Sequence, residues 1–356
     1  MDKNAKIYIA GHRGLVGSAI FNKLKSENYN NLLLADKNTL DLRNQQTTQD
    51  FFINNKPDYV ILAAAKVGGI IANNTYKADF IYDNLMIASN VIKVAKDNGV
   101  KKLLNLGSSC IFPKNADIPI KEEYLLTGEL EQTNEPYAIA KIAAIKLCRY
   151  FNEQYGTDFI SLMPNNLYGI NDNFNLETSH VLPALIRKVL IADALNNGNI
   201  EFLINDFKSH RIGFGLDAKF DRTVESLKKI YFSLGISENK ITLWGSGKVY
   251  REFLFNDDLA DASVFVMEGF SSKEIGEFIN VGYGSDITIL ELAEIIKSII
   301  GFKGTIEFDK SKPDGTFRKL MDTTRINNLG WKPKIDIETG IKIVVESYRK
   351  KIMASI

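Results

Sequence analysis

Four side chains in the middle of the chain have the types and spacing needed to reduce a ketone. Ser108 and Cys110 lie in the run Gly107-Ser108-Ser109-Cys110, and Tyr137 precedes Lys141 by four positions. Residues four apart share one face of a helix. Beside a bound nicotinamide, this pair could hand a proton to a ketone oxygen as hydride arrives at its carbon, while the Ser108 hydroxyl holds that oxygen. Cys110 is not needed for such a reduction, so it indicates a second chemistry in the same pocket.

The Tyr-x-x-x-Lys spacing also occurs by chance on solvated helices that have no catalytic role. Here it follows a glycine-rich turn and a serine after a strand, in that order, and Pro136 suits the first turn of a helix. The combination favours catalysis. Tyrosine has an ordinary pKa of about 10. We expect Lys141 and the nicotinamide charge to lower the pKa of Tyr137, and we expect Lys141 also to hold the nicotinamide ribose.

A glycine-rich turn near the N-terminus predicts a dinucleotide site. Glycines at every third position let the backbone turn tightly and bring its N–H groups to a pyrophosphate at a helix N-terminus. A purely structural turn is the alternative, but the position between a strand and a helix favours the cofactor. The residues of this turn are Gly11, His12, Arg13, Gly14, Leu15, Val16 and Gly17.

The choice between NADP and NAD depends on the end of the second strand, Ala35-Asp36-Lys37. An acid there usually binds the ribose hydroxyls of NAD, whereas cations bind the 2′-phosphate of NADP. Asp36 therefore favours NAD, and Arg13 with Lys37 favours NADP; a surface Asp-Lys pair without a cofactor role is a third reading. We predict NADPH, because two cations outweigh one carboxylate at a phosphate.

Short apolar runs alternate with helical patterns through the first half of the chain, which predicts an α/β fold with a doubly wound parallel sheet of the Rossmann type. The predicted strands are Ile7–Ala10, Leu32–Ala35, Tyr59–Ala63, Lys102–Leu106, Phe159–Met163 and, much later, Phe278–Val281. The predicted helices are Leu15–Glu27, Ala78–Asn98, Tyr137–Tyr155, Leu290–Ile300 and Ile337–Lys350.

Two domains are expected. Residues 1–165 form the dinucleotide-binding domain, to which a later strand and helix return, and residues 166–356 form mainly a smaller α/β lobe for substrate. Such a lobe would close a cleft at the carboxyl edge of the sheet.

The composition is that of a soluble globular protein, with 45% hydrophobic residues, 24% charged residues and a net charge of +1. This balance gives no reason to expect nucleic acid or a membrane as partner. Two cysteines make no disulfide framework, and no metal-ligand cluster stands out. The chain starts almost at once with a strand and has no signal-peptide pattern, so we expect a cytoplasmic enzyme without a metal.

Several segments together resemble the extended short-chain dehydrogenase/reductase family and, within it, the GDP-L-fucose synthases. The matching segments are Gly11–Gly17, Ala63–Ile70, Gly107–Pro113, Asn134–Lys141, Asn166–Gly169, Ser179–Leu185, Trp244–Gly247 and Lys312–Gly315. That family is bifunctional: it epimerises C3 and C5 of a GDP-4-keto-6-deoxy-mannose and then reduces C4 with NADPH.

The resemblance implies roles for particular residues. Cys110 and His180 would exchange the C3 and C5 protons, which the C4 ketone acidifies; a buried inert cysteine and a core histidine are the commoner alternatives. The residues implied at the nicotinamide side are Leu106, Gly107, Ser108, Lys141, Pro164, Asn165, Asn166, Leu167 and His180. Those implied at the GDP-sugar are Lys188, Trp244, Arg251 and Asp314. Asn165 replaces the family's usual threonine, and Lys188 replaces its usual arginine.

Between Lys188 and Trp244 the chain has 55 residues, longer than the family's usual connection by roughly 40. This insert, residues 190–240, contains the basic run Lys208-Ser209-His210-Arg211 and a predicted helix, Arg222–Leu234. It is either a surface elaboration, for example for oligomerisation, or a wall that changes which sugar fits, such as a larger 4-keto-heptose.

The main prediction is therefore an NADPH-dependent reductase of a GDP-linked 4-keto sugar, with or without epimerisation. A reductase that lacks epimerisation and acts on a 6-deoxy-heptose remains open. A nucleotide-sugar 4-epimerase or 4,6-dehydratase and a non-catalytic NAD(P)-sensing protein are the less favoured alternatives. The resembled family pairs two subunits through helices that correspond to 78–98 and 137–155, so we expect a homodimer.

Overall fold

The computed structural model describes residues 1–312 and 314–354, with only the backbone for residues 70 and 71. Pro313, inside the matched segment Lys312–Gly315, lies outside the described residues, as do the last two residues of the predicted lobe. A six-stranded sheet has the order β10-β5-β4-β3-β1-β2, and each neighbouring pair is parallel. Its strands are β1 (Ile7–Ala10), β2 (Leu32–Leu33), β3 (Tyr59–Leu62), β4 (Lys102–Leu106), β5 (Phe159–Pro164) and β10 (Ile279–Val281). The predicted Rossmann-type sheet is confirmed.

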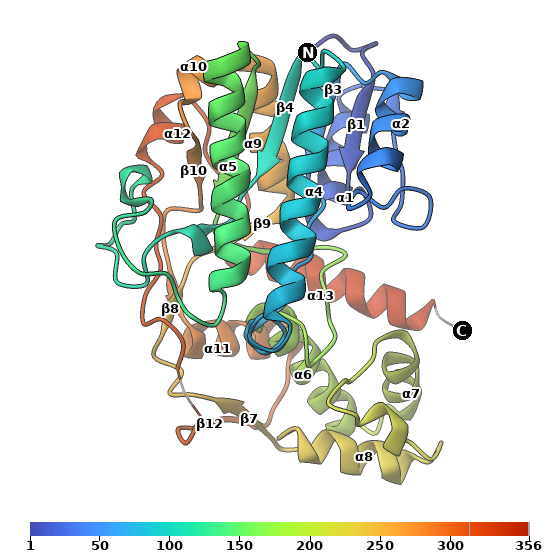
Figure 1. Cartoon of the computed structure of the whole chain (residues 1–356). Coiled ribbons are helices and arrows are strands. Elements are labelled where there is room, and N and C mark those ends of the chain that lie inside the picture. The colour runs from blue at the N-terminus through green and yellow to red at the C-terminus, as the bar shows by residue number, and fades with distance from the viewer. Residues whose placement is uncertain (313, 355–356) are drawn as a thin grey trace.

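Helices cover both faces of this sheet (Figure 1). On one face α4 (Lys77–Asp97) packs against α5 (Glu135–Tyr155), with α2 (Gln45–Asn55) beside α4; on the other, α1 (Leu15–Ser26) packs against α9 (Asn256–Gly269). Successive strand residues point to opposite faces. Ile7 and Ile9 accordingly join the apolar cluster under α1 and α9, while Tyr8 joins the cluster under α2, α4 and α5.

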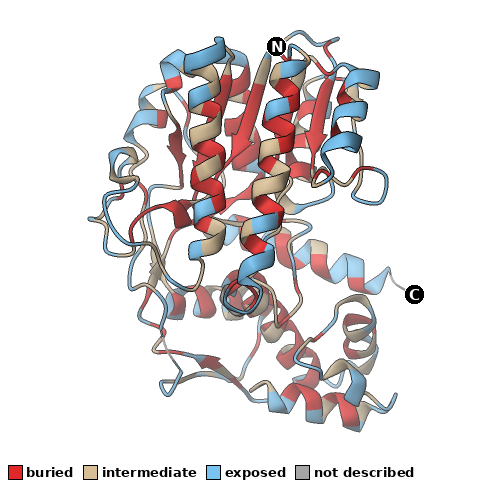
Figure 2. Ribbon diagram, viewed as in Figure 1, coloured by how far each residue is buried: buried red, intermediate tan, exposed pale blue. Residues whose placement is uncertain are grey.

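Strands that are buried on both faces consist of continuous apolar residues. This explains why their positions could be predicted from the sequence. Figure 2 shows the central strands buried beneath half-exposed helices. β2 is the exception, because it ends at Leu33 rather than at residue 35. Three residues after Leu33, Asp36 accepts hydrogen bonds from the N–H groups of Asn38 and Thr39 (3.0 and 3.1 Å), and this turn takes the backbone out of the sheet.

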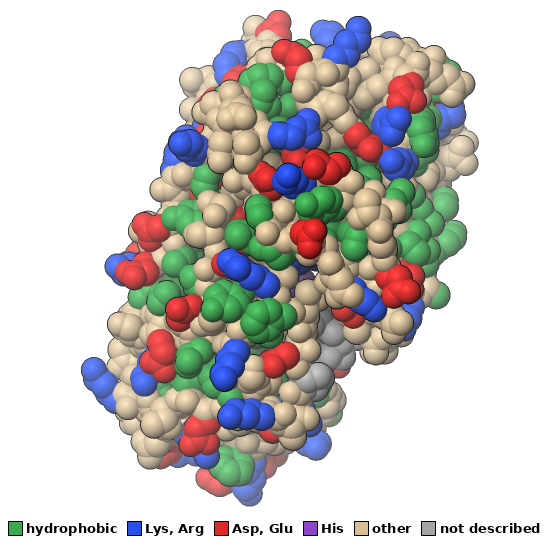
Figure 3. All heavy atoms as spheres, turned by 90° about the vertical axis from the view of Figure 1, so that its left-hand side faces the viewer, with side chains coloured by type: hydrophobic (Ala, Val, Ile, Leu, Met, Phe, Trp, Pro, Cys, Tyr) green, Lys and Arg blue, Asp and Glu red, His purple; other side chains and the backbone are tan. Residues whose placement is uncertain are grey.

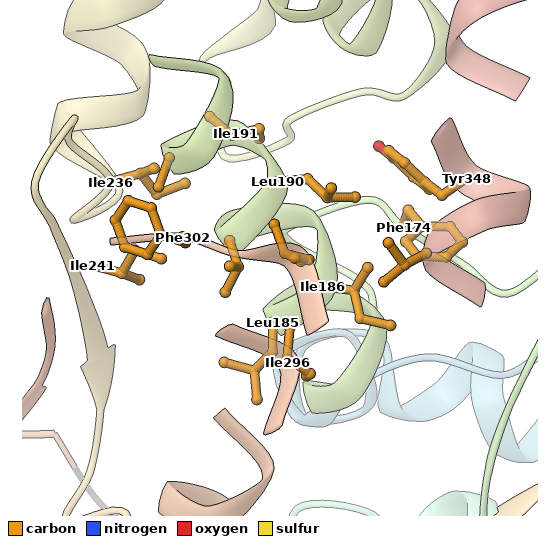
Figure 4. Packing of buried hydrophobic residues seen from close by; sticks show 14 of the residues in the cluster. Phe174, Leu185, Ile186, Leu190, Ile191, Ile236, Ile241, Ile296, Phe302 and Tyr348 are labelled. Atoms are coloured by element: carbon orange, nitrogen blue, oxygen red, sulfur yellow. The ribbon is translucent and has the colours of Figure 1, made fainter. Parts of the chain in front are cut away.

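The second half of the chain builds a lobe below the sheet (Figure 1). Its helices are α6 (Val181–Asn196), α7 (Ile200–Ser209), α8 (Val224–Ser233), α11 (Ile289–Ile300) and α13 (Ile337–Met353). Its strands form the pairs β7 (Lys240–Trp244) with β12 (Thr305–Asp309) and β8 (Tyr250–Arg251) with β11 (Ile287–Thr288). Figure 4 shows the core of this lobe, where Leu185, Ile186, Leu190 and Ile191 of α6 lie among side chains from the surrounding elements.

The remaining elements are short connections. They are α3 (Ile70–Thr75), α10 (Ser272–Ile275), α12 (Thr324–Asn328), β6 (Asn166–Tyr168), β9 (Phe253–Phe255) and three 3₁₀ turns at Ser109–Ile111, Glu122–Tyr124 and Asp217–Lys219. A later strand, β10, and a later helix, α9, return to the first domain, while the boundary near residue 165 stays a prediction.

The predicted insert is a packed part of the lobe. Leu203 of α7 and Leu227 and Tyr231 of α8 are fully buried in the lobe's apolar core. The predicted helix Arg222–Leu234 is α8. His210, from the run expected to be basic, stacks on Tyr348 of α13 with ring centroids 5.0 Å apart. That this segment is an addition relative to the resembled family remains a prediction.

Within residues 1–312 and 314–354, none of the helices has both the length and the apolar character that crossing a bilayer requires.

Candidate active site

The glycine turn lies between β1 and α1, as predicted. Gly11 has φ +85°, and a Cβ on it would lie 2.8 Å from the backbone nitrogen of Ala64. A Cβ on Gly17 would lie 2.2 Å from the carbonyl oxygen of Gly11. Gly14 begins α1, and no side chain in the described chain caps this helix. The first-turn N–H groups therefore face the loop, which is the arrangement that binds a dinucleotide pyrophosphate.

Next to this turn, Arg13 projects into solvent with 72% of its side chain exposed and pairs with Asp36 at 3.0 Å. His12 has a buried Nδ1 without a hydrogen-bond partner in the described part of the chain. Burial, and then the charge of Arg13, lower the pKa of His12. Arg13 and Lys37 are the two cations expected at the 2′-phosphate. In the structure the carboxylate of Asp36 already neutralises Arg13. The assignment of these side chains to the cofactor remains a prediction.

Ser108 and Cys110, the predicted catalytic serine and cysteine, lie at the start of a 3₁₀ turn that follows β4. Ser108 caps this turn, since its Oγ accepts the N–H of Cys110 at 3.4 Å. The backbone N–H of Ser108 contacts the Sδ of Met163 at 3.0 Å, where Met163 belongs to β5. The strand end and its neighbour therefore fix the direction of the turn at the carboxyl edge of the sheet, the usual ligand edge.

Tyr137 and Lys141 lie on one face of α5, as the spacing predicted, with the Lys141 Nζ 5.7 Å from the tyrosine ring centroid. The charge of Cys110 acts to raise the pKa of both Tyr137 and Lys141. Burial lowers the pKa of Lys141 to about 8. The expected lowering of the Tyr137 pKa is wrong for the protein alone, because burial and then the charge of Cys110 raise it. Tyr137 is therefore protonated at neutral pH, the form that a proton donor needs.

Cys110 is buried, with 7% of its surface exposed. Burial raises the pKa of its thiol, whereas the charge of Lys319, a hydrogen bond to Ser108 and the charge of Lys141 act in the opposite direction. Sequence reasoning missed Lys319. It follows the matched segment Lys312–Gly315 by four positions, and no local pattern distinguishes it from a surface lysine. Only the tertiary fold brings it to the thiol.

His180 directly precedes α6 and is solvent-exposed, yet the surrounding protein atoms desolvate its ring and lower its pKa. Contacts connect its segment to the tyrosine. Gly69 donates its N–H to the carbonyl of Thr178 at 2.9 Å. From the same loop, Lys66 lies over the ring of Phe80, which meets the ring of Tyr137 edge-on at 6.4 Å. The segment of His180 thus reaches the catalytic pocket through one loop and one aromatic ring.

The predicted nicotinamide segment, Pro164–Leu167, crosses from the sheet to the lobe. β5 ends at Pro164, and β6 begins at Asn166 and pairs with β9. Asn165 alone separates the two strands. The Nδ2 of Asn166 donates to the carbonyl oxygen of Glu252 at 3.0 Å. The segment is therefore tied to the lobe by backbone pairing and by side chains.

Three of the four residues implied at the GDP-sugar come together in the lobe. Asp314 accepts the N–H of Ser246 at 2.8 Å, two residues after Trp244, whose side chain is 58% exposed. Arg251 donates to the carbonyl of Thr316 at 2.7 Å. Burial lowers the pKa of Arg251, and the charge of Asp314 opposes that effect. An exposed ring, a carboxylate and a guanidinium thus share one cluster.

Lys188 lies on α6, which packs against β7, the strand that ends at Trp244. Burial lowers its pKa to about 8. Among the residues described, no carboxylate forms an ion pair with it. The carbonyl oxygen of Lys319 accepts from the Asn165 Nδ2 at 3.4 Å. Burial lowers the pKa of the Lys319 side chain, and the charges of Cys110 and Arg251 shift that pKa in opposite directions. Figure 3, which looks at the left-hand side of the view in Figure 1, shows a hollow at mid-height on the molecular surface.

A parallel dinucleotide-type sheet with Ser108, Tyr137 and Lys141 at its carboxyl edge defines the class of Rossmann-type oxidoreductases. The chain belongs to the NAD dependent epimerase/dehydratase family, whose profile matches residues 7–205 and 217–282. The residues left out between these two stretches fall within the predicted insert.

Relatives and solved structures are similar to this protein along nearly its whole chain. "Putative GDP-L-fucose synthase 2" of Arabidopsis thaliana is 49% identical, over 99% of this chain and 94% of its own. A GDP-6-OMe-4-keto-L-xylo-heptose reductase from Campylobacter jejuni is 43% identical, with a TM-score of 0.91 over 99% of each chain. A GDP-mannoheptose C4 reductase from the same organism, with NADP bound, is 43% identical, with a TM-score of 0.86 over 98% of this chain and 99% of that one.

Proposed function

We propose that the protein is an NADPH-dependent reductase of the C4 ketone in a GDP-linked 4-keto-6-deoxy sugar, of the GDP-L-fucose synthase kind. The observation that carries this proposal is the placement of Tyr137 and Lys141 on one face of α5, where Lys141 donates to the carbonyl oxygen of Leu106 at 2.7 Å, two residues before Ser108. An anionic nucleotide held at Arg251 brings its sugar to the catalytic turn. Support also comes from relatives named GDP-L-fucose synthase and GDP-heptose reductase.

The glycine turn and Arg13 hold the cofactor, which when bound supplies hydride to the C4 carbon. Tyr137 keeps its proton until the ketone oxygen gains electron density and then donates it. The Ser108 hydroxyl holds the same oxygen. Lys141 holds the ribose and stabilises the phenolate that Tyr137 leaves behind. These roles give each of the three matched catalytic residues one atom to act on.

Three cationic side chains bind the diphosphate of the GDP-sugar. Lys188, Arg251 and Lys319 each have a pKa lowered by burial, which means that each charge is incompletely solvated. A buried cation without a carboxylate partner gains most when an anion arrives. The exposed ring of Trp244 and the carboxylate of Asp314 then recognise the remainder of the nucleotide by stacking and by accepting N–H bonds.

Epimerisation at C3 and C5 belongs to the same proposal. Burial raises the pKa of the Cys110 thiol, and desolvation by neighbouring protein atoms lowers the pKa of the exposed His180, so both groups are uncharged at neutral pH. A neutral thiol and a neutral imidazole can together remove one carbon-bound proton and return another.

The alternative is a reductase without epimerisation that acts on a larger GDP-4-keto-heptose. The similarity to heptose reductases in fold and sequence favours it, as does the packed segment 190–240, which adds buried side chains to the substrate lobe.

One experiment separates these activities. Purified protein receives the GDP-linked fucose precursor or a 6-deoxy-4-keto-heptose analogue in D₂O, and loss of NADPH absorbance is followed with deuterium content at C3 and C5. Stoichiometric NADPH loss on the fucose precursor, with deuterium at both carbons, is expected. Reduction without deuterium, or a strong preference for the heptose, supports the alternative. Turnover without net NADPH loss points to a 4-epimerase or dehydratase, and no turnover at all to an NAD(P)-sensing protein.

We further propose that the protein is a cytoplasmic homodimer. α4 and α5 lie side by side on the outer face of the first domain (Figure 1) and expose Tyr82, Ile139, Tyr150 and Tyr155. Apolar surface gathered on two adjacent helices suits a contact with a second copy. A light-scattering mass near one 40.0 kDa chain contradicts this assembly. The reducing cytoplasm keeps Cys110 a thiol and supplies NADPH.

A further inference from the structure

A buried carboxylate lies next to the catalytic turn and has no role in the proposed chemistry. Glu252 is 0% exposed. Its Oε1 accepts the N–H of Gly284 at 2.7 Å, and its Oε2 accepts the N–H of Met321 at 2.9 Å as well as the side-chain Nδ2 of Asn165. In the part of the chain that the structure describes, no Lys or Arg forms an ion pair with it. Each of these partners is an N–H donor, so the ionised carboxylate is the form that fits them; burial raises the pKa of Glu252, and these hydrogen bonds act in the opposite direction.

The side-chain amide of Asn165 connects Glu252 by hydrogen bonds to the turn that contains Ser108 and Cys110. While its Nδ2 donates to Glu252, its Oδ1 accepts the hydroxyl of Ser109 at 3.2 Å and the N–H of Asn166 at 3.0 Å. Both ends of the amide therefore have matching partners, and the reversed orientation would place donor against donor. Ser109 lies between Ser108 and Cys110, the residues assigned to reduction and to epimerisation.

The same carboxylate joins three segments of the substrate side. Arg251 directly precedes it, and its own carbonyl oxygen accepts from Asn166. Met321 follows Lys319 by two positions, and the Lys319 carbonyl accepts from the Asn165 Nδ2 at 3.4 Å. Glu252 thus stands between the cations that hold the diphosphate and the turn that holds the reacting groups.

We propose that Glu252 is a positioning residue which, through Asn165, fixes the Ser108–Cys110 turn relative to Arg251 and Lys319. This inference rests on the proposed function. The carboxylate contacts neither the sugar nor the cofactor. It acts by keeping the amide of Asn165 in one orientation, so that phosphate contacts and the reacting groups share one rigid anchor.

Three variants test the hydrogen-bond polarity. Glu252→Gln must turn an NH₂ group toward an N–H donor, and Asn165→Asp sets one carboxylate against another. The double variant again has one carboxylate and one amide, now exchanged. We expect Glu252→Gln to bind NADPH normally, and we expect each single variant to lose about 10- to 100-fold in kcat with little change in the KM for the sugar. The double variant should recover part of that loss, incompletely because the Met321 N–H then faces an NH₂ group.

The matched control is Asp258→Asn. Asp258 is another buried carboxylate, 2% exposed, and it accepts the N–H groups of Lys334 and Ile335, both at 3.0 Å. This variant should melt at a lower temperature and keep the wild-type kcat. A loss of kcat equal to that of Glu252→Gln would mean that neutralising any buried acid harms the enzyme, and the proposal would fall. If Glu252→Gln does not fold, Glu252→Asp replaces it, since it keeps the charge and shortens the reach.

A second measurement does not need the sugar. Alkylation of Cys110 by iodoacetamide is followed by peptide mass spectrometry, with the buried Cys148 as internal reference. Glu252→Gln should change the Cys110 rate several-fold and leave the Cys148 rate unchanged. Wild-type alkylation together with wild-type kcat overturns the inference, as does a double variant no better than the poorer single one. A protein that reduces no GDP-4-keto sugar refutes the proposed function instead, while the alkylation comparison still decides the role of Glu252.

Discussion

Lys141 donates a hydrogen bond from its Nζ to the carbonyl oxygen of Leu106 at 2.7 Å and so joins helix α5 to the last residue of strand β4. Ser108 follows two positions later. The side chain of Lys141 therefore fixes the position of Tyr137 relative to the turn that contains Ser108. This is in addition to the proposed contact of Lys141 with the nicotinamide ribose. The proposed catalytic residues of the two elements are thus held together by the protein itself.

Tyr137→Phe should lower kcat by about 10²- to 10⁴-fold, since no other group is assigned to protonate the ketone oxygen. The ring and its edge-on contact with Phe80 are retained, so NADPH affinity should stay near that of the wild type. Steady-state kinetics and fluorescence titration with NADPH measure the two effects. The control is Tyr150→Phe, on the exposed side of the same helix, which should behave as wild type. Turnover that survives in Tyr137→Phe would show that another group is the acid.

Lys188→Met should stabilise the unliganded protein at pH 7 and weaken substrate binding. The folded-state pKa of Lys188, about 8, lies below the ordinary lysine value, so keeping it charged costs on the order of 3 kcal/mol below pH 8. That cost disappears as the pH rises from about 8 toward 10. The melting temperature of the variant should exceed that of wild type at pH 7, and the two should converge near pH 10.

The KM of Lys188→Met for the GDP-sugar should rise, because one phosphate contact is lost, while kcat stays close to wild type. GDP should raise the melting temperature of wild type more than that of the variant. Lys229→Met, on the insert helix α8, is the matched control. Equal stabilisation of both proteins by GDP would remove Lys188 from the phosphate site.

Asp36→Asn should increase the preference for NADPH over NADH by about tenfold. The carboxylate pairs with Arg13 at 3.0 Å and so competes with a 2′-phosphate for the same guanidinium. The amide keeps the turn to Asn38 and Thr39 and removes the charge. The ratio of kcat/KM for the two cofactors measures the effect, with the exposed Asp50→Asn as control. An unchanged ratio would mean that Arg13 and Asp36 separate at no cost when the cofactor binds.

Asp206→Asn should destabilise the lobe by about 3–5 kcal/mol, because it leaves a buried guanidinium without its counter-charge. Arg187 and Asp206 are both 0% exposed, and two guanidinium nitrogens contact the carboxylate at 2.8–3.2 Å. Carbonyl oxygens of Phe174, His210 and Arg211 accept the remaining N–H bonds. Thermal unfolding followed by circular dichroism measures the loss. Asp217→Asn, a carboxylate in the same segment near the surface, should cost far less.

Local sequence patterns were sufficient for the sheet and for the placement of Ser108 and Cys110 after a strand and of Tyr137 and Lys141 on one helix face. Strands β1 and β4 have the predicted bounds, since buried parallel strands are short apolar runs, and the Tyr137–Lys141 spacing follows from helix geometry. The patterns failed where distant segments meet. Lys319 reaches Cys110, and Glu252 reaches Asn165, only through the tertiary fold. The raised pKa of Tyr137 in the protein alone was not predicted, because burial cannot be read from a spacing of four.

Asn165 is the only residue between strand β5 of the cofactor sheet and strand β6 of the lobe. A joint of one residue, hydrogen-bonded at both ends of its side chain, has no slack and does not work as a hinge. We therefore expect a sugar to enter by movement of the outer loops while the sheet and the lobe keep their relative position. In this architecture the choice of sugar can evolve at the periphery of the lobe, and the alignment of proton donor and carbonyl is inherited unchanged.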